Sequence, residues 1–338
     1  MPLIGKLHID HPVANVLFTS ENSHNKEGIF DPIIRLKLAL HSHNISLSTN
    51  PKGEIADFDI YLDCYPKTLC SRPSFLIAME CPIFTPEIYD PSYTILFSKI
   101  FSWNHKLESL PNHINITHPS NITPEHFNSF NNRDIFCCLI NANKISPNNN
   151  PSDLYQKREE IIRWYEKNKS TDFHLYGRGW DKPKPAKNAI DRVFRRNLTR
   201  LRTKLFSYTP YPSYKGELSK KSTALSNTKF CFCYENIYGL EGYITEKIFD
   251  AMRYGTVPIY LGAPNITDYI PKDCFIDARN FTNISALNDF LHSISETEFD
   301  LYQKHIQNFL VSNKAFIFSP EHFATTITKH ILTELAES

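Results

Sequence analysis

Two carboxylates and a lysine occur close together in the segment from Lys229 to Ile266. Glu235 follows a short run in which aromatic residues alternate with cysteines, and Glu246 and Lys247 precede an apolar series with helical spacing. An aromatic-rich run of this length favours a buried strand. The segment predicts a strand, a polar loop, a helix that ends at Gly255, and a second strand.

This order places polar side chains where ligands bind in open α/β sheets. The loop that leaves the carboxyl end of a strand meets the amides and the positive dipole of the next helix. A lysine at that position, Lys247, can bond an anionic group such as a phosphate. A carboxylate such as Glu246 would repel phosphate, but it can accept hydrogen bonds from sugar hydroxyls.

The residues YENIYGLEGYITEKIFDA, followed by GTVPIYLGAPN, resemble the donor-binding signature of the α1,3-fucosyltransferases, inverting enzymes that take fucose from GDP-fucose. HLYGRGW (174–180) and AMECPIF (78–84) are similar to weaker motifs of that family in the expected order. The resemblance therefore covers roughly residues 74–285. It implies the GT-B architecture, in which two Rossmann-like α/β domains face each other across a cleft.

The chain has the size and the pattern for such a fold. Its 338 residues are 41% hydrophobic, enough for two cores. Strand-like and helical segments alternate, which predicts largely parallel sheets. We expect an N-terminal α/β domain over 1–135 with the acceptor side and the base, a C-terminal α/β domain over 150–300 that binds the nucleotide sugar, and a helical tail over 301–338 that could pack on the first domain. The expected strands are 16–19, 45–48, 58–62, 75–79, 135–140, 173–176, 230–234 and 257–261.

The resemblance implies a set of donor-binding residues in the signature and in the Gly-Arg-Gly turn. They are Arg178, Glu235, Asn236, Tyr243, Thr245, Glu246 and Lys247. For Glu235 the equal alternative is capping of amides in its own loop, and for Tyr243 it is packing in the core. Arg178 would otherwise be a solvated turn residue, and Lys247 an exposed helical lysine.

Inverting transfer needs a base near the acceptor hydroxyl, on the face opposite to the departing phosphate. Such a base belongs to the other domain. Glu80 follows the apolar run FLIAM and precedes Cys81-Pro82, which forces an extended exit from the strand. The family has its base in a similar segment, with Ser where this chain has Cys81. A solvated strand-end glutamate is the alternative, and Glu87 and Asp90 are the next candidates.

No H-E-x-x-H cluster occurs, and no Asp-x-Asp motif stands where a metal-dependent GT-A enzyme would carry its cation, so we expect no required metal and no cofactor beyond the donor, GDP-fucose. The resemblance implies an oligosaccharide or glycolipid acceptor, as in lipopolysaccharide O-antigen synthesis, with fucose linked α1,3 to GlcNAc or a related residue. A transferase for another GDP-hexose and a non-catalytic sugar-nucleotide or glycan-binding protein remain alternatives. The combination of Glu80 with Glu246 and Lys247 favours an enzyme.

Charge and cysteine content bear on partners and location. The net charge of +1 and the pI near 7.6 argue against nucleic-acid binding by the whole chain. Residues 174–204 carry ten Lys or Arg against two Asp, which fits a solvated basic face or contact with phosphate or anionic lipid. Eight Cys without a disulfide or zinc spacing are expected to be reduced. With no signal-peptide pattern and no apolar run near ~18 residues, we expect a cytoplasmic protein, with peripheral contact to the inner face of a membrane as an option.

Overall fold

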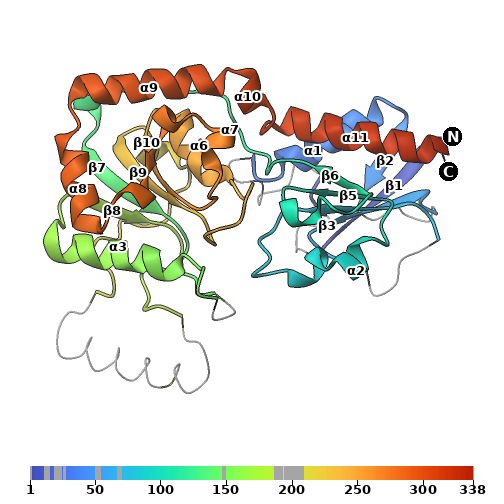
Figure 1. Cartoon of the computed structure of the whole chain (residues 1–338), viewed down its shortest axis with the longest axis horizontal. Coiled ribbons are helices and arrows are strands. Elements are labelled where there is room, and N and C mark those ends of the chain that lie inside the picture. The colour runs from blue at the N-terminus through green and yellow to red at the C-terminus, as the bar shows by residue number, and fades with distance from the viewer. Residues whose placement is uncertain are drawn as a thin grey trace.

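Two parallel sheets organise the chain in the computed structural model, which describes residues 2–10, 16–18, 25, 28–49, 55–66, 71–146, 150–185, 193 and 209–337. Each sheet carries its own helices, and the two domains lie side by side (Figure 1). The arginines expected on a helix, Arg192, Arg195, Arg196, Arg200 and Arg202, lie outside the described residues.

The N-terminal domain is built on a six-stranded sheet with the order β2-β1-β3-β4-β5-β6. Its strands are β1 (Leu3–Ile9), β2 (Ile45–Ser48), β3 (Phe58–Leu62), β4 (Ser74–Ala78), β5 (Lys99–Ser102) and β6 (His113–Asn115), and its helices are α1 (Asp31–His41) and the short α2 (Pro91–Thr94). β4 is buried along its whole length, as an apolar strand inside a parallel sheet should be. Glu80 lies just beyond its carboxyl end.

The C-terminal domain is built on a five-stranded sheet with the order β11-β10-β9-β7-β8. Its strands are β7 (Ile135–Ile140), β8 (Phe173–Tyr176), β9 (Thr228–Tyr234), β10 (Val257–Leu261) and β11 (Ile276–Asp277). The expected start of this domain at residue 150 is too late. β7 pairs in parallel with both β8 and β9, so the apolar run IFCCLI finds its partners in this sheet.

Helices cover the second sheet and then return to the first domain. They are α3 (Tyr155–Asn168), α5 (Ser222–Leu225), α6 (Glu246–Arg253), α7 (Ile266–Tyr269), α8 (Ile284–Ser293), α9 (Glu296–Leu310), α10 (Asn313–Phe316) and α11 (Pro320–Glu337). α9 packs on the C-terminal core, whereas α11 lies beside α1 and buries Phe323 and Ile327 in the N-terminal core (Figure 1). The chain therefore crosses twice between the domains.

The two crossings are bonded to each other. The Thr117 hydroxyl donates to the carbonyl of Ile317 (2.6 Å), and the Ser120 amide donates to the carbonyl of Phe318 (2.7 Å). Two hydrogen-bonded crossings constrain how one domain moves against the other. This junction fixes the domains that must together form a cleft.

Two further expectations are answered by the described residues. The segment 16–18 is a turn rather than part of a strand, and the first strand is β1. The seven described cysteines are free thiols, as expected for a reduced protein. Among the described residues, no helix is long and apolar enough to cross a membrane.

Candidate active site

A cavity of about 230 Å³ lies between the two domains, and both contribute to its walls. Glu80 and Phe84 come from the N-terminal domain. The C-terminal domain supplies Asn141, Ala142, Lys144, Tyr155, Arg158, Asn236, Glu246 and Lys247. We call it the interdomain cavity. Glu80, Asn236, Glu246 and Lys247 were among the residues expected from the sequence to form a site, and the structure brings them together here.

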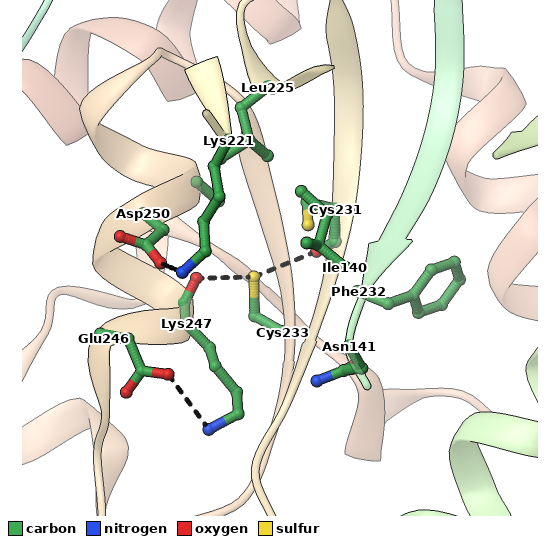
Figure 2. Close-up of a pocket in the computed structure, with 11 residues that line it drawn as sticks. Ile140, Asn141, Lys221, Leu225, Cys231, Phe232, Cys233, Glu246, Lys247 and Asp250 are labelled. Atoms are coloured by element: carbon green, nitrogen blue, oxygen red, sulfur yellow. Dashed lines mark hydrogen bonds and ion pairs between the residues drawn. The ribbon is translucent and has the colours of Figure 1, made fainter. Parts of the chain in front are cut away.

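A smaller cavity of about 60 Å³, the inner cavity, lies within the C-terminal domain beside β9 and α6 (Figure 2). Lys221 and Asp250 form an ion pair on its wall. Asn141, Glu246 and Lys247 line both cavities. The start of α6 therefore stands where the two cavities adjoin, in the position expected for the strand-to-helix loop of an α/β sheet.

Lys247 is held at the start of α6 by three oxygen atoms. Its Nζ donates to Thr245 Oγ1 (2.9 Å) and Glu235 Oε2 (3.2 Å), and it lies 3.6 Å from Glu246 Oε1 (Figure 2). Burial opposes the charge on Lys247, but the carboxylates of Glu235 and Glu246 outweigh it and raise the pKa of the ammonium. The cavities are thus lined by a cation that stays protonated at neutral pH.

Glu246 also remains charged. Burial would raise its pKa, but the nearby Lys247, with His118 and Lys221, lowers the pKa of the carboxyl below its ordinary value. Its side chain is 43% exposed, so it can meet a ligand that enters the cavity. An ionised carboxylate at this position can accept hydrogen bonds from two hydroxyls.

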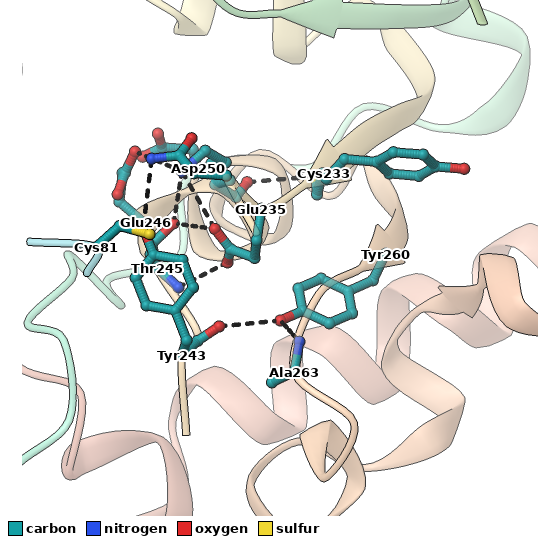
Figure 3. A network of polar contacts seen from close by, with 12 residues as sticks. Cys81, Cys233, Glu235, Tyr243, Thr245, Glu246, Asp250, Tyr260 and Ala263 are labelled. Carbon is teal, nitrogen blue, oxygen red and sulfur yellow. Dashed lines mark hydrogen bonds and ion pairs between the residues drawn. The ribbon is translucent and has the colours of Figure 1, made fainter. Parts of the chain in front are cut away.

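Glu235 does not face a ligand. Its side chain is fully buried, and its oxygens accept from the Thr245 amide (2.8 Å), the Thr245 hydroxyl (2.7 Å) and Lys247 (Figure 3). Glu235 lines neither cavity, and the structure has the alternative arrangement, in which Glu235 caps its own loop. Thr245 is equally buried and serves the same network. Both residues act by holding Lys247.

Tyr243 likewise packs in a core instead of lining either cavity. It is 2% exposed, and its ring lies 4.7 Å from that of Trp103 in the N-terminal domain. Ile237 joins the same cluster, so the loop between β9 and α6 inserts apolar side chains into the neighbouring domain. Large aromatic rings contribute most of the buried apolar area at such a contact. The expected donor-pocket role of Tyr243 is replaced by one in domain contact.

Glu80 is exposed at the end of β4 and reaches the interdomain cavity. One of its carboxylate oxygens accepts from the Cys81 amide (2.7 Å). The reserve candidates Glu87 and Asp90 do not line the cavity, and Asp90 accepts the amide of Ser92 at the start of α2. Of the three carboxylates considered as a base, Glu80 alone lines the interdomain cavity.

Sequence reasoning missed several residues of the interdomain cavity, which are Phe84, Asn141, Ala142, Lys144, Tyr155 and Arg158. Of these, Arg158 makes the most contacts with the signature loop. It lies on α3, is 3% exposed, and donates to the carbonyls of Tyr234 and Glu235 (both 2.7 Å) and to the Asn236 side chain (3.1 Å). The sequence did hold a signal, because Arg158 lies on the same helical face as the apolar residues Tyr155 and Ile162. Burying an arginine on such a face costs free energy unless it is hydrogen-bonded, so its position indicates buried partners.

Arg178 lies beside the segment 141–144, which contributes to the wall of the interdomain cavity. It follows β8 with an exposed side chain, and its carbonyl accepts from the Asn143 amide (2.9 Å). It is not among the residues that line either cavity. Phosphate contact by Arg178 stays a prediction. Within the described parts of the chain, no group of three or more His, Cys, Asp or Glu could hold a metal ion.

Comparison with known proteins finds similarity to fucosyltransferases. Residues 199–323 match the model of the glycosyltransferase family 10 (fucosyltransferase) C-terminal domain. The chain is 35% identical over 105 residues to an α-(1,3)-fucosyltransferase of Helicobacter pylori, which covers 30% of this chain and 21% of that protein. It is 37% identical over 73 residues to an α-(1,4)-fucosyltransferase of Arabidopsis thaliana, with 22% and 18% covered. The resemblance to fucosyltransferases inferred from the motifs is confirmed, and the match spans about a fifth of the length of these relatives.

Solved structures show the same fold over nearly the whole chain. An α1,3-fucosyltransferase with GDP superimposes with a TM-score of 0.54 at 15% identity, over 97% of this chain and 90% of that one. A glycosyltransferase from Rickettsia africae gives a TM-score of 0.57 at 11% identity, over 100% and 99%. The expected architecture of two α/β domains, that of the GT-B glycosyltransferases, is confirmed.

Proposed function

We propose that this chain is an inverting fucosyltransferase that moves fucose from GDP-fucose to a hydroxyl of a glycan. One observation carries the proposal. A single interdomain cavity is lined by the carboxylate of Glu80 from one domain and by Glu246 and Lys247 from the other. That arrangement supplies a base on one side and a cation on the other, as displacement with inversion requires.

In the proposed reaction, Glu80 takes the proton of the acceptor hydroxyl as its oxygen forms a bond to the anomeric carbon of fucose. The bond from that carbon to the phosphate oxygen breaks, and its electron pair leaves with GDP. Lys247, at the positive end of α6, stabilises the growing charge on the phosphates. Glu246 accepts hydrogen bonds from donor hydroxyls.

The acceptor and the linkage form a second part of the proposal. The matched relatives are named as α-(1,3)- and α-(1,4)-fucosyltransferases, and another, from Xenopus tropicalis, as a GDP-fucose protein O-fucosyltransferase. Enzymes named for different products share the same short match to this chain. We infer that residues outside the matched segment select the acceptor. We propose α1,3 transfer to GlcNAc or a related residue of an oligosaccharide or glycolipid, such as an O-antigen intermediate.

The test is a calorimetric titration of the purified chain with GDP, GDP-fucose, GDP-mannose and UDP-glucose, followed by an assay of GDP release with glycan acceptors. We expect the GDP compounds to bind, the UDP sugar to bind far more weakly, and release of GDP from GDP-fucose to depend on the acceptor. Binding without turnover on any acceptor would support a non-catalytic protein. Preference for GDP-mannose would make it a transferase for another GDP-hexose.

Metal dependence has its own assay. Because fixed cations already face the donor site, we expect transfer to continue in EDTA. Loss of activity that added Mn²⁺ restores would contradict a metal-free site. Cytoplasmic location stays a prediction, as does membrane contact through 174–204, much of which lies outside the described residues.

A further inference from the structure

Asp63 stands immediately after β3, next to the exit of β4 that carries Glu80. Its backbone has φ +50°, a left-handed conformation that costs an aspartate free energy and suits glycine or asparagine better. Among the described residues, only Asn44 is another non-glycine residue with positive φ. A strained position beside a candidate base suggests a functional reason for the side chain.

The Asp63 side chain binds two consecutive backbone amides, those of Met79 and Glu80. Its Oδ1 accepts the amide of Met79 (2.6 Å) and the amide of Glu80 (2.7 Å), and its own amide donates to the carbonyl of Ile77 (2.9 Å). Both amides lie beyond the end of β4, where no strand partner bonds them. The Asp63 carboxylate therefore supplies the hydrogen-bond acceptor that a neighbouring strand would supply inside the sheet.

Two other side chains bind the carbonyls of the same two residues, Met79 and Glu80. The Tyr89 hydroxyl donates to the carbonyl of Glu80 (2.5 Å), and Trp103 Nε1 donates to the carbonyl of Met79 (3.0 Å). The backbone of Glu80 is thus held at its N–H and at its C=O. A side chain on a backbone fixed in this way has few rotamers from which to reach the interdomain cavity.

We propose that Asp63 is a positioning residue, which holds the backbone of Glu80 so that its carboxylate faces the interdomain cavity. This inference rests on the proposed function, in which Glu80 is the base. Catalysis is sensitive to such placement, since a displacement of about 1 Å can cost on the order of 10²-fold in rate. The oxygen that accepts the two amides, rather than the negative charge, is the feature that matters.

Burial supports a role for the oxygen over the charge. It raises the pKa of Asp63 to about 7, against the effect of the two amides and with the help of the Glu80 carboxylate. A protonated carboxyl keeps an acceptor oxygen for both amides. Replacement by asparagine keeps that oxygen, tolerates positive φ and removes the charge.

The test uses three variants, Asp63→Gly, Asp63→Asn and Asn44→Gly. Asp63→Gly removes the acceptor without straining the backbone, and we expect kcat to fall at least about tenfold with the KM for GDP-fucose unchanged. Asp63→Asn should restore most of that turnover. Asn44→Gly changes the other left-handed residue, before β2, and controls for loss of stability alone. In a Glu80→Gln background, Asp63→Gly should cause no further fall in kcat.

Hydrogen exchange of the amides in 74–84 separates this inference from the proposed function. We expect faster exchange at Met79 and Glu80 in Asp63→Gly and no change there in Asn44→Gly. If the wild-type chain transfers no fucose, the proposed function fails, and exchange alone then decides whether Asp63 holds the turn. Unchanged exchange, or normal kcat in Asp63→Gly with only a lower Tm, would overturn the positioning role.

Discussion

The buried carboxylate of Glu235, which lines neither cavity, holds the ammonium of Lys247 in place. Breaking a buried ion pair on one side strands the other charge, at a cost of about 3–5 kcal/mol. Lys247 therefore has two effects: it neutralises the buried charge of Glu235, and it would bind an anionic ligand. The two effects can be measured separately, because Glu235→Gln removes the buried charge but keeps an oxygen that accepts the Thr245 amide.

Lys247→Met should weaken GDP binding by about 1.5–3 kcal/mol, the value of a charge-assisted hydrogen bond. It should also lower the free energy of unfolding. The double variant Glu235→Gln/Lys247→Met should regain most of the stability but none of the GDP affinity, measured by calorimetry and urea unfolding. Lys157→Met, on the exposed face of α3, is the control and should change neither. Unchanged GDP affinity in a folded Lys247→Met protein would remove Lys247 from the donor site.

The raised pKa of Asp63 predicts a pH-dependent stability. Its ordinary pKa is 3.8 and its folded value is about 7, because burial and the charge of Glu80 favour the protonated form. The folded chain therefore holds this proton more tightly. The stabilisation is complete below about pH 3.8 and is lost as pH rises through 7.

Asp63→Asn lacks this titration. Relative to that variant, the wild-type free energy of unfolding should fall between pH 5 and pH 8 in urea experiments. The other ionisable groups that act on Asp63, Glu80 and Tyr89, are common to both proteins. A difference that stays constant across this range would show that Asp63 titrates near its ordinary pKa.

At the level of single residues, the sequence motifs predicted where the interdomain cavity lies, but they did not predict which of their side chains face it. Glu80, Glu246 and Lys247 line the interdomain cavity as expected. Glu235 and Tyr243 turned inward, because burial along an irregular loop follows no sequence period that would show which side chains face the core. Arg158 comes from a helix 76 residues before Tyr234, the carbonyl that it binds, so only the fold brings it near.

The loop between β9 and α6 is the element that joins the proposed donor site to the proposed base. At its amino end Arg158 binds the carbonyls of Tyr234 and Glu235, and further along Tyr243 packs against Trp103. Trp103 in turn bonds Met79, next to Glu80. The loop therefore connects the two halves of the cavity through direct contacts.

Two glycines in this loop provide a matched test. Gly242 and Gly239 have φ of +75° and +86°, so alanine strains both. A Cβ on Gly242 would lie 2.8 Å from the Trp103 carbonyl and 2.9 Å from His105, whereas one on Gly239 meets nothing within 4 Å. We expect Gly239→Ala to cost about 1 kcal/mol in unfolding free energy. Gly242→Ala should cost more and should also lower kcat, because it pushes the domains apart. Equal effects of the two substitutions would mean that the loop does not set the domain contact.

Strands could be predicted where they are short, apolar runs. The expected ranges 45–48, 58–62, 135–140, 173–176 and 257–261 agree with β2, β3, β7, β8 and β10. β1 was missed although it is internal to its sheet, because Lys6 and His8 interrupt the apolar pattern. His8 is accommodated by a hydrogen bond to the buried Asp59 (2.7 Å). Such a compensating contact cannot be inferred from local sequence.

For the molecule as a whole, the core of the N-terminal domain is completed by segments from the C-terminal part of the chain. α11, at the C-terminus, fills the core of the first domain, and the loop before α6 enters the same core. The cavity between the domains is therefore built on a fixed frame. Parallel sheets follow from the alternation of strands and helices, but the order of the strands and the packing of the tail depend on apolar faces that meet only in three dimensions.

The central claim is that one cavity joins a base from the first domain to a donor site in the second, and Glu80→Gln tests it most directly. Glutamine keeps the size and the Cys81 amide contact but cannot take a proton at neutral pH. We predict that kcat for transfer from GDP-fucose falls ~10²-fold or more, while the Kd for GDP, measured by calorimetry on the same protein, stays within about twofold. Near-normal kcat would place the base elsewhere, and a parallel loss of GDP binding would place Glu80 in the donor half of the cavity.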